Sequence, residues 1–562
     1  MSQSRLFEEL PRDVAALLCS LLRFEDLRSL VRASRALRRS LFREEWLHKT
    51  RLTVPPSDAV AARMMEAMDD VAASSITNVV LVESSHLAIV SRKLSATLAS
   101  LRISNDGYMA NSYEPIAVLP QLDRFQRLRR LDLSGSAILG VASLAGLTHL
   151  TELDVSLTVV VDISPLHKLT RLQVLNLERT RVKSISVVRA MPELRVLNLN
   201  GTQSLKSLTP IACLKKLVAL SINDKDLVEL DSLLAVAPTL TTLDAIDVSF
   251  LGEQVAPPVR HSALSSLVRL QHLRTWPMSW TQSLEPLHTI KNLRALDIRF
   301  PPFSDLAPLQ YLTDLEELQL MIFAARDTAP LGELTKLRRL VVTGCPNNPH
   351  ALDFVDRLPV LSHLSLSGEI HFSVVARLGH LDALELNFSG ASWGAFPQND
   401  RLPPSMWTAL TSVKKLSLRF PVGDPADLSG LVAVKQLESL SKLEFLDLTS
   451  TNVANIEPLA GLRRLQQIEL AYTRVTDVSP LATLKQLRRV VLPIEASCLP
   501  LVRADLPHLR TILHEHRDCL WNVTHHRVYE EREREIDADA VPVASDALDD
   551  LAVAFGEFTG DY

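Results

Sequence analysis

The densest group of side chains that could bind a metal ion lies near the C-terminus, in the segment HEHRDCLWNVTHH. Structural zinc sites take their ligands in pairs with characteristic short spacings, and this segment matches none of those classes. We therefore predict no metal site, and we interpret residues 516–529 as a C-terminal cap around Trp521. The nitrogen and sulfur donors of the segment are His514, His516, Cys519, His525 and His526.

Sequence motifs for other chemistry are missing. No phosphate-binding loop, nucleophile elbow, H-E-x-x-H zinc helix or G-x-G-x-x-G turn occurs in the chain. The cysteines are far apart and form no C-x-x-C pair, which favours a reducing compartment. We predict a protein that is not an enzyme and needs no cofactor. The cysteines are Cys19, Cys213, Cys345, Cys498 and Cys519.

A short leucine motif, L-x-x-L-x-L, repeats along most of the chain. Complete copies, such as LQVLNLERTRVKSISVVRAMPE from Leu172, have 22 residues. The x-L-x-L part predicts a short strand whose leucines point into the core, while the intervening residues face outward. Roughly nineteen such turns stack into one array. The motif starts at residues 76, 98, 128, 150, 172, 194, 217, 240, 273, 293, 315, 337, 361, 381, 413, 443, 465, 487 and 509.

This pattern resembles the 22-residue internalin-type leucine-rich repeat over residues 76–515. The resemblance implies an α/β repeat solenoid, a horseshoe or arc with a parallel β-sheet on its concave face. Threonine at the ninth position of several turns, such as Thr158 and Thr180, is expected to donate to a carbonyl of a neighbouring turn. The D-I/V-S-P-L segment that follows predicts a short helical turn begun by proline.

Residues 1–52 have a different pattern, which is typical of helices. Apolar residues recur at intervals of three and four after Pro11, and Trp46 closes the unit. This arrangement resembles an F-box, although Leu37 stands where that family usually has an aromatic residue. The resemblance implies docking onto a Skp-type adaptor of a cullin ubiquitin ligase. The docking residues would be Leu10, Pro11, Val14, Leu17, Leu18, Leu21, Leu27, Leu30 and Val31.

The alternative for residues 1–52 is a helical cap that shields the apolar end of the solenoid from water. Residues 53–75, which include the helix-favouring run AVAARMMEAMDDVAA, predict a linker helix between this module and the first turn.

Charge is unevenly distributed along the chain. The whole chain carries −5, but residues 530–562 hold eleven acidic residues against two arginines, or −9, which leaves +4 for the rest. Such a body lacks the basic stripe that nucleic-acid binding requires, so no nucleic acid is expected, and the acidic tail is expected to be disordered. The chain has no secretory signal and no apolar stretch long enough for a membrane helix. We therefore expect a soluble protein of the cytoplasm or nucleus with no membrane partner.

Outward-facing positions differ between the earlier and later turns. Earlier turns carry small polar or acidic residues there, such as Asp132 and Asp154, which we interpret mostly as solvated residues of the sheet surface. Later turns carry large apolar residues, mainly at the eighth position, and soluble proteins seldom expose such a patch without a partner. The alternative is that these side chains belong to the core. The predicted partner-binding stripe consists of Trp280, Phe300, Met321, Ile322, Phe388, Phe420, Phe445 and Tyr472.

These features predict the substrate receptor of a Skp-cullin-F-box ubiquitin ligase. Its N-terminal helices would bind the adaptor, and its repeats would hold an unidentified protein substrate. The alternative is a ligase-independent scaffold or regulatory protein that uses the same concave sheet. An extracellular receptor conflicts with the missing signal and the missing cysteine-rich caps.

Overall fold

The computed structural model of the chain describes residues 51–54, 61–62, 65, 77–81, 86–103, 119, 122–202, 205, 207–223, 231–246, 265–276, 284–298, 304–322, 325, 327–345, 350–368, 381–387, 410–419, 437–451, 453–494, 496–498, 501 and 506–514. The F-box-like module up to residue 50, the C-terminal cap at 516–529 and the acidic tail at 530–562 lie outside the described residues. The chain divides near residue 256 into two units, which we describe separately.

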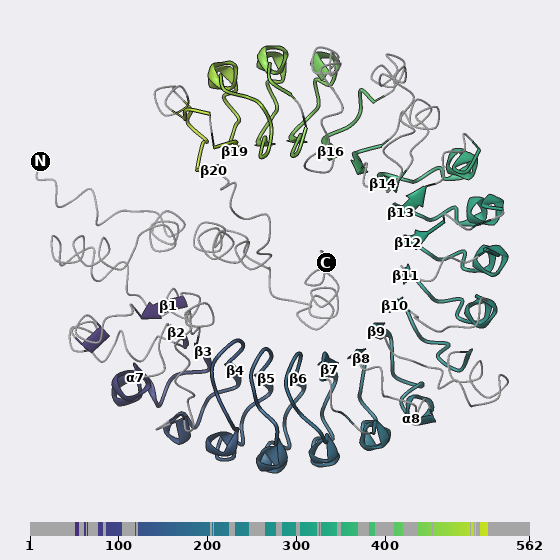
Figure 1. Ribbon diagram of the computed structural model, residues 1–562. Coiled ribbons are helices and arrows are strands. Elements are labelled where there is room, and N and C mark those ends of the chain that lie inside the picture. Colours follow the sequence, from purple (N-terminus) through teal and green to yellow (C-terminus); the bar gives the residue numbers. More distant parts are fainter. Residues whose placement is uncertain are drawn as a thin grey trace, which may run out of the picture. The chain divides into compact units, whose positions relative to one another are not determined.

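The first unit is a row of parallel strands in which each strand pairs with the next one in sequence (Figure 1). Its strands are β1 (Arg51–Val54), β2 (Asn78–Leu81), β3 (Ser100–Ile103), β4 (Arg130–Asp132), β5 (Glu152–Asp154), β6 (Val174–Asn176), β7 (Val196–Asn200), β8 (Ala219–Asn223) and β9 (Thr242–Ile246). Its α-helices are α7 (Leu87–Leu94) and α8 (Asp231–Leu234), and its 3-10 helices are η3 (Leu122–Arg124), η4 (Ala142–Leu144), η5 (Ser164–Lys168), η6 (Ser186–Ala190) and η7 (Thr209–Cys213).

The second unit has the same parallel arrangement. Its strands are β10 (His272–Trp276), β11 (Ala295–Ile298), β12 (Glu317–Met321), β13 (Arg339–Cys345), β14 (His363–Gly368), β15 (Ala383–Asn387), β16 (Lys415–Arg419), β17 (Phe445–Asp447), β18 (Gln467–Glu469), β19 (Arg489–Leu492) and β20 (Thr511–His514). Its 3-10 helices are η8 (Glu285–Thr289), η9 (Ala307–Tyr311), η10 (Ala329–Glu333), η11 (Asp353–Arg357), η15 (Leu437–Ser439), η16 (Glu457–Gly461) and η17 (Ser479–Thr483).

The leucines of the motif fill the space between strands and helices. In β5, Leu153 is buried, and the flanking Glu152 and Asp154 lie on the opposite face of the strand. The 3-10 helix η5 has proline in its first turn, as the D-I/V-S-P-L segment predicted, and buries Leu166. In each unit the strands occupy the inner side of a curved row and the 3-10 helices the outer side (Figure 1). The predicted α/β repeat solenoid with a parallel sheet is confirmed for each unit.

The strand register confirms all but one of the predicted motif starts. Leu273 pairs with Leu296, the fourth residue of its motif, so the turn of β10 starts at Leu270 and not at residue 273. The segment LVRLQHL carries leucine at every third position, and the motif therefore fits two frames. In the observed frame, Trp280 no longer falls at the eighth position.

One further strand precedes the predicted first turn. Residues Arg51–Val54 form β1 and pair in parallel with Asn78–Leu81, with Leu52 opposite Val79. The predicted boundaries at residues 52 and 75 are therefore wrong at this point, because the array of strands already begins at residue 51. Within the predicted linker, residues 61, 62 and 65 are helical.

The eighth residue of many turns has a left-handed backbone, a conformation that is unfavourable for residues other than glycine. Its amide donates to the following turn, as in the bond of 2.7 Å from Leu157 N to the Glu178 carbonyl. The bonds between turns therefore continue past the end of the strand. The described residues with positive φ all stand at this position, and they are Gly135, Leu157, Arg179, Gly201, Gly344, Gly368, Ser450 and Tyr472.

The threonines at the ninth position bond within their own turn. Thr180 Oγ1 donates to the carbonyl of Leu177 at 2.7 Å, three residues earlier, and Thr158 bonds in the same way. The prediction of a bond to a neighbouring turn is wrong. The physical reason is proximity, because the turn folds the buried hydroxyl back over the carbonyl of the sixth residue. No helix among the described residues is long and apolar enough to cross a bilayer.

Candidate protein-binding site

A shallow groove of about 460 Å³ lies on the outward face of strands β2 to β6 in the first unit. Outward residues of these strands stand at the third and fifth positions of each turn, where the alternation of the strand directs them away from the core. The groove combines guanidinium, carboxylate and amide groups with a few apolar side chains. Its lining includes Asn78, Val80, Ser100, Arg102, Asp132, Glu152, Asp154, Val174 and Asn176.

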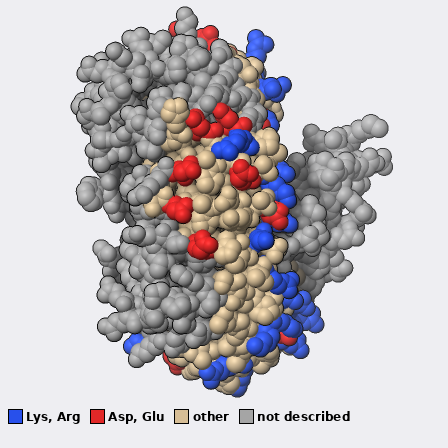
Figure 2. Space-filling model, turned by 90° about the vertical axis from the view of Figure 1, so that its right-hand side faces the viewer, with Lys and Arg blue, Asp and Glu red and all other residues tan. Residues whose placement is uncertain are grey.

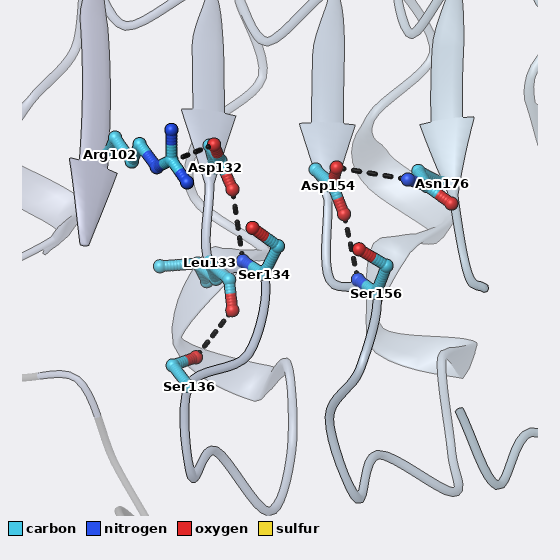
Figure 3. A network of polar contacts seen from close by, with 8 residues as sticks. All are labelled: Arg102, Asp132, Leu133, Ser134, Ser136, Asp154, Ser156 and Asn176. Atoms are coloured by element: carbon cyan, nitrogen blue, oxygen red, sulfur yellow. Dashed lines mark hydrogen bonds and ion pairs between the residues drawn. The ribbon is translucent and has the colours of Figure 1, made fainter. Parts of the chain in front are cut away.

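In the turns of β4 and β5, the fifth residue closes the end of its own strand. Oδ1 of Asp132 accepts the Ser134 amide at 3.0 Å, and Oδ1 of Asp154 accepts the Ser156 amide at 2.8 Å (Figure 3). These carboxylates satisfy amides that no strand partner reaches. The interpretation of the recurring acids as merely solvated residues is wrong for this part of the sheet, because one oxygen of each has a structural bond.

The second carboxylate oxygen contacts a polar side chain of an adjoining turn, as an ion pair for Asp132 and as a hydrogen bond for Asp154. Oδ2 of Asp132 lies 3.2 Å from Nε of Arg102, and Oδ2 of Asp154 accepts Nδ2 of Asn176 at 3.0 Å (Figure 3). At the third position, Arg130 Nε lies 2.9 Å from Glu152 Oε1. The floor of the groove is thus a ladder of polar side chains whose positions are fixed by one another.

Burial sets the electrostatics of this ladder. It raises the pKa of Asp154 above its ordinary value, and the neighbouring Asp132 carboxylate adds to the rise against the hydrogen bonds from Ser156 and Asn176. Burial also raises the pKa of Glu152, although the Arg130 guanidinium opposes the shift. The groove thus presents carboxyl groups with raised pKa values beside guanidinium donors.

At the β6 end of the groove, the third-position row becomes apolar. Val174 pairs with Val196, and Val196 pairs with Ala219, in adjoining strands. These three side chains form a cluster in which each is no more than 8% exposed. Sequence analysis did not identify this row, although Val, Val and Ala at the same position of three successive turns were the available signal.

Four of the eight residues of the predicted aromatic stripe lie in the described part of the chain. Ile322 is 1% exposed, so it belongs to the core and its predicted exposure is wrong, since strand alternation turns it inward beside the outward Met321. Met321, Phe445 and Tyr472 are half-buried and stand at the seventh, third and eighth positions of their turns, so they form no common row. The remaining predicted members, Trp280, Phe300, Phe388 and Phe420, lie outside the described residues.

The other sequence predictions concern adaptor binding, metal binding and the cysteines. The adaptor-binding residues from Leu10 to Val31 lie outside the described residues. No cluster of three or more metal-ligating side chains occurs in the part of the chain that the structure describes. Among the described cysteines, Cys345 is buried, and burial raises the pKa of its thiol to about 12, so the thiol stays protonated at neutral pH.

The sequence matches no family model and no curated protein. Solved structures with a similar fold include an internalin of Listeria monocytogenes, which is 17% identical, with 72% of this chain and 85% of that chain covered and a TM-score of 0.24. A leucine-rich-repeat protein of Leptospira interrogans is 16% identical, with coverage of 78% and 98% and a TM-score of 0.39. The complex of TLR13 with a single-stranded RNA is 15% identical, with coverage of 82% and 72% and a TM-score of 0.43. The repeat register and the parallel strand pairing make each unit of this chain a leucine-rich-repeat solenoid.

Proposed function

We propose that the chain is a non-catalytic binding protein that holds a segment of a partner protein in the groove on β2 to β6. The observation that carries the proposal is the polar ladder of Arg102, Asp132, Asp154 and Asn176, which is held in place by bonds between adjoining turns. Ordered donors and acceptors lower the conformational cost of binding. A groove with guanidinium, carboxylate and amide groups fits the mixed donors and acceptors of a polypeptide.

The test blocks the groove with large side chains and leaves Asp132 and Asp154, which bond to amides of their own turns, unchanged. Asn78→Arg with Ser100→Arg adds bulk at two outward third positions, and Ala295→Arg makes the same change at the third position of β11 as a matched control. Full-length chains serve as bait in quantitative affinity purification. The amount of a groove-binding partner that is recovered should fall at least tenfold with the double variant and stay unchanged with the control. Equal recovery from all three chains would reject the groove as the site.

We propose further, from the F-box resemblance of residues 6–52 alone, that the N-terminal helices dock a Skp-type adaptor and make the chain a substrate receptor of a cullin ubiquitin ligase. Changing Leu10→Ala, Pro11→Ala and Leu17→Asp together should remove adaptor and cullin from the purified complex while the melting temperature stays unchanged. A much lower melting temperature with adaptor still bound would instead identify these helices as a cap of the solenoid.

The aromatic residues of the later turns remain a proposed second contact for the partner. Replacing Phe300, Phe388 and Phe420 with serine should reduce recovery of the partner but leave the adaptor and the melting temperature unchanged. A large fall in melting temperature would place the three rings in the core, because buried aromatic residues contribute several kcal/mol each.

A further inference from the structure

A second groove, of about 840 Å³, lies in the first unit at the margin where the chain enters strands β4 to β6. It is lined mainly by residues that stand just before these strands, among them Arg127, Arg129 and Arg171. Backbone bonds between successive turns fix this margin, such as the bond of 2.8 Å from Thr151 N to the Arg129 carbonyl. The guanidinium groups therefore extend from a rigid edge.

The charge of this groove is not neutralised within the described part of the chain. Its one acidic lining residue, Glu152, is paired with Arg130. Arg127, Arg129 and Arg171 form no ion pair with any described residue, and all three are exposed. Arg171 Nη1 donates to His149 Nδ1 at 3.2 Å.

The corresponding margin of the second unit also carries basic residues. Figure 2 shows that Lys and Arg side chains gather along one margin of the surface drawn there, while Asp and Glu lie mostly away from it. Some basic residues before the strands of the second unit have acidic partners, such as Lys336 with Asp314 at 2.5 Å and Lys414 with Asp382 at 2.9 Å. Others, such as Arg464 and Arg488, are exposed and form no ion pair with any described residue. The guanidinium groups of Arg127, Arg129 and Arg171 line one groove and are available to an anionic ligand.

The chain itself contains a segment of matching charge. In EREREIDAD, residues 531–539, every second residue is acidic, namely Glu531, Glu533, Glu535, Asp537 and Asp539. In an extended chain alternate side chains point to the same side, so this spacing gives one face with a carboxylate about every 7 Å. Because the segment belongs to the same polypeptide, its binding to the groove would be intramolecular and independent of protein concentration.

We propose that residues 531–539 bind in cis to the basic groove at Arg127, Arg129 and Arg171, and thereby exclude other anionic ligands from it. The contact consists of exposed charge pairs, so it is reversible and weakens as ionic strength rises. The basic groove borders the polar groove on β2 to β6 through the Arg130–Glu152 pair, which lines both.

Zero-length cross-linking of the full-length chain tests the contact. Arg127→Lys, Arg129→Lys and Arg171→Lys keep the charge and provide amines that a carbodiimide can couple to carboxylates. The exposed Lys183, which follows β6 at the opposite margin, is an internal control. Mass spectrometry should find the introduced lysines coupled to residues 531–539 in 50 mM salt, with at least tenfold less coupling in 500 mM salt. Coupling to Lys183 at the same level, or no coupling at the groove, would overturn the proposal.

Competition provides a second measurement. A full-length chain with Glu531→Gln, Glu533→Gln, Glu535→Gln, Asp537→Asn and Asp539→Asn should bind a fluorescent synthetic peptide of residues 530–562 about tenfold more tightly than the natural chain. Adding Arg127→Glu, Arg129→Glu and Arg171→Glu should abolish that binding, while Asn78→Arg with Ser100→Arg should leave it unchanged. If the variant with the five Gln and Asn substitutions binds a single-stranded oligonucleotide but not the peptide, the groove is a nucleic-acid site and the proposal fails.

Discussion

Strands β4 to β6 and strands β12 to β14 end in different ways. The former have three residues each, and β13 has seven. In the short strands a hydroxyl at the ninth position bonds the carbonyl of the sixth residue, at 2.7 Å for Thr180. In β13 the ninth residue is Cys345, whose sulfur lies 3.9 Å from the Val342 carbonyl. A strong bond inside the turn removes the carbonyl that would otherwise extend the strand pairing.

Strand β7 shows that the hydroxyl is not the whole explanation. It keeps Thr202, whose Oγ1 donates to the Leu199 carbonyl at 2.8 Å, yet it has five residues. Its neighbour β8 also has five residues and pairs with it up to Asn200. The length of a strand in this sheet therefore depends both on its own turn and on the strand beside it.

Removing a core leucine should have the largest effect in both regions. Leu175→Ala and Leu340→Ala each truncate a side chain that is 0% exposed, and each should lower the free energy of unfolding by about 2–5 kcal/mol. Because a turn contacts mainly its neighbours, hydrogen exchange should increase in the turns next to the substitution and little elsewhere. Loss of protection along the whole chain would contradict the picture of locally coupled turns.

Exchanging the ninth residue should have a smaller effect, of opposite sign in the two regions. Thr180→Val removes the hydroxyl but keeps the shape, and should lower the free energy of unfolding by about 1 kcal/mol. Cys345→Thr replaces a weak sulfur donor with a hydroxyl and should raise it by about 0.5–1 kcal/mol. Chemical denaturation measures both. If both substitutions change stability with the same sign, the comparison between these turns is mistaken.

Gly201→Ala, at the eighth position of the β7 turn, should lower the free energy of unfolding by about 1 kcal/mol. The reason is that Gly201 has φ of 69° and an added Cβ would lie 3.0 Å from Arg179 Cγ. Gly461→Ala, at a position where an added Cβ meets nothing within 4 Å and φ is not left-handed, is the control. Equal effects of the two substitutions in chemical denaturation would show that backbone handedness at the eighth position is unimportant.

The smallest expected effect concerns the ionised Asp154. Its raised pKa in the folded chain means that its favourable contribution to stability is present at low pH and is lost as pH rises through that pKa. Asp154→Asn, which keeps an oxygen for the Ser156 amide, should therefore raise the melting temperature by about 1–2 °C more at pH 7 than at pH 4. Asp477→Asn is the opposite case, because hydrogen bonds from Ser479 lower the pKa of this exposed carboxylate, so the substitution should lower the melting temperature more at pH 7 than at pH 4. Identical shifts at both pH values would contradict burial as the cause.

Most of the repeat architecture could be predicted from the leucines, because a buried residue at fixed spacing determines both the face and the register of a strand. The frame failed at β10, where leucines at 267, 270 and 273 fit the motif in two ways and only the pairing with β11 decides between them. Strand β1 was missed because Lys49 stands where its motif would have the first leucine.

The candidate site was less predictable than the fold. The sequence shows Asp132 and Asp154 at equivalent positions, but not that each uses one oxygen for its own turn and the other for a neighbour. Glycine at the eighth position, as in Gly135, Gly201 and Gly344, indicated a left-handed backbone there. Leu157 and Arg179 have the same conformation, but their residue types give no such indication. Ile322 was misassigned because hydropathy alone does not distinguish an outward apolar residue from an inward one.

Between successive 22-residue turns, polar contacts join residues 22 positions apart, as Asp154 does with Asn176 and Thr151 with the Arg129 carbonyl. Loss of the stretch from Leu150 to Arg171 would bring Asn176 beside Asp132, with every later leucine still facing inward. Loss of half that length would turn charged residues of the adjoining turns toward the core. In evolutionary terms, one turn is the smallest amount of sequence that a duplication or deletion can add to or remove from this stretch while its pairing stays in phase.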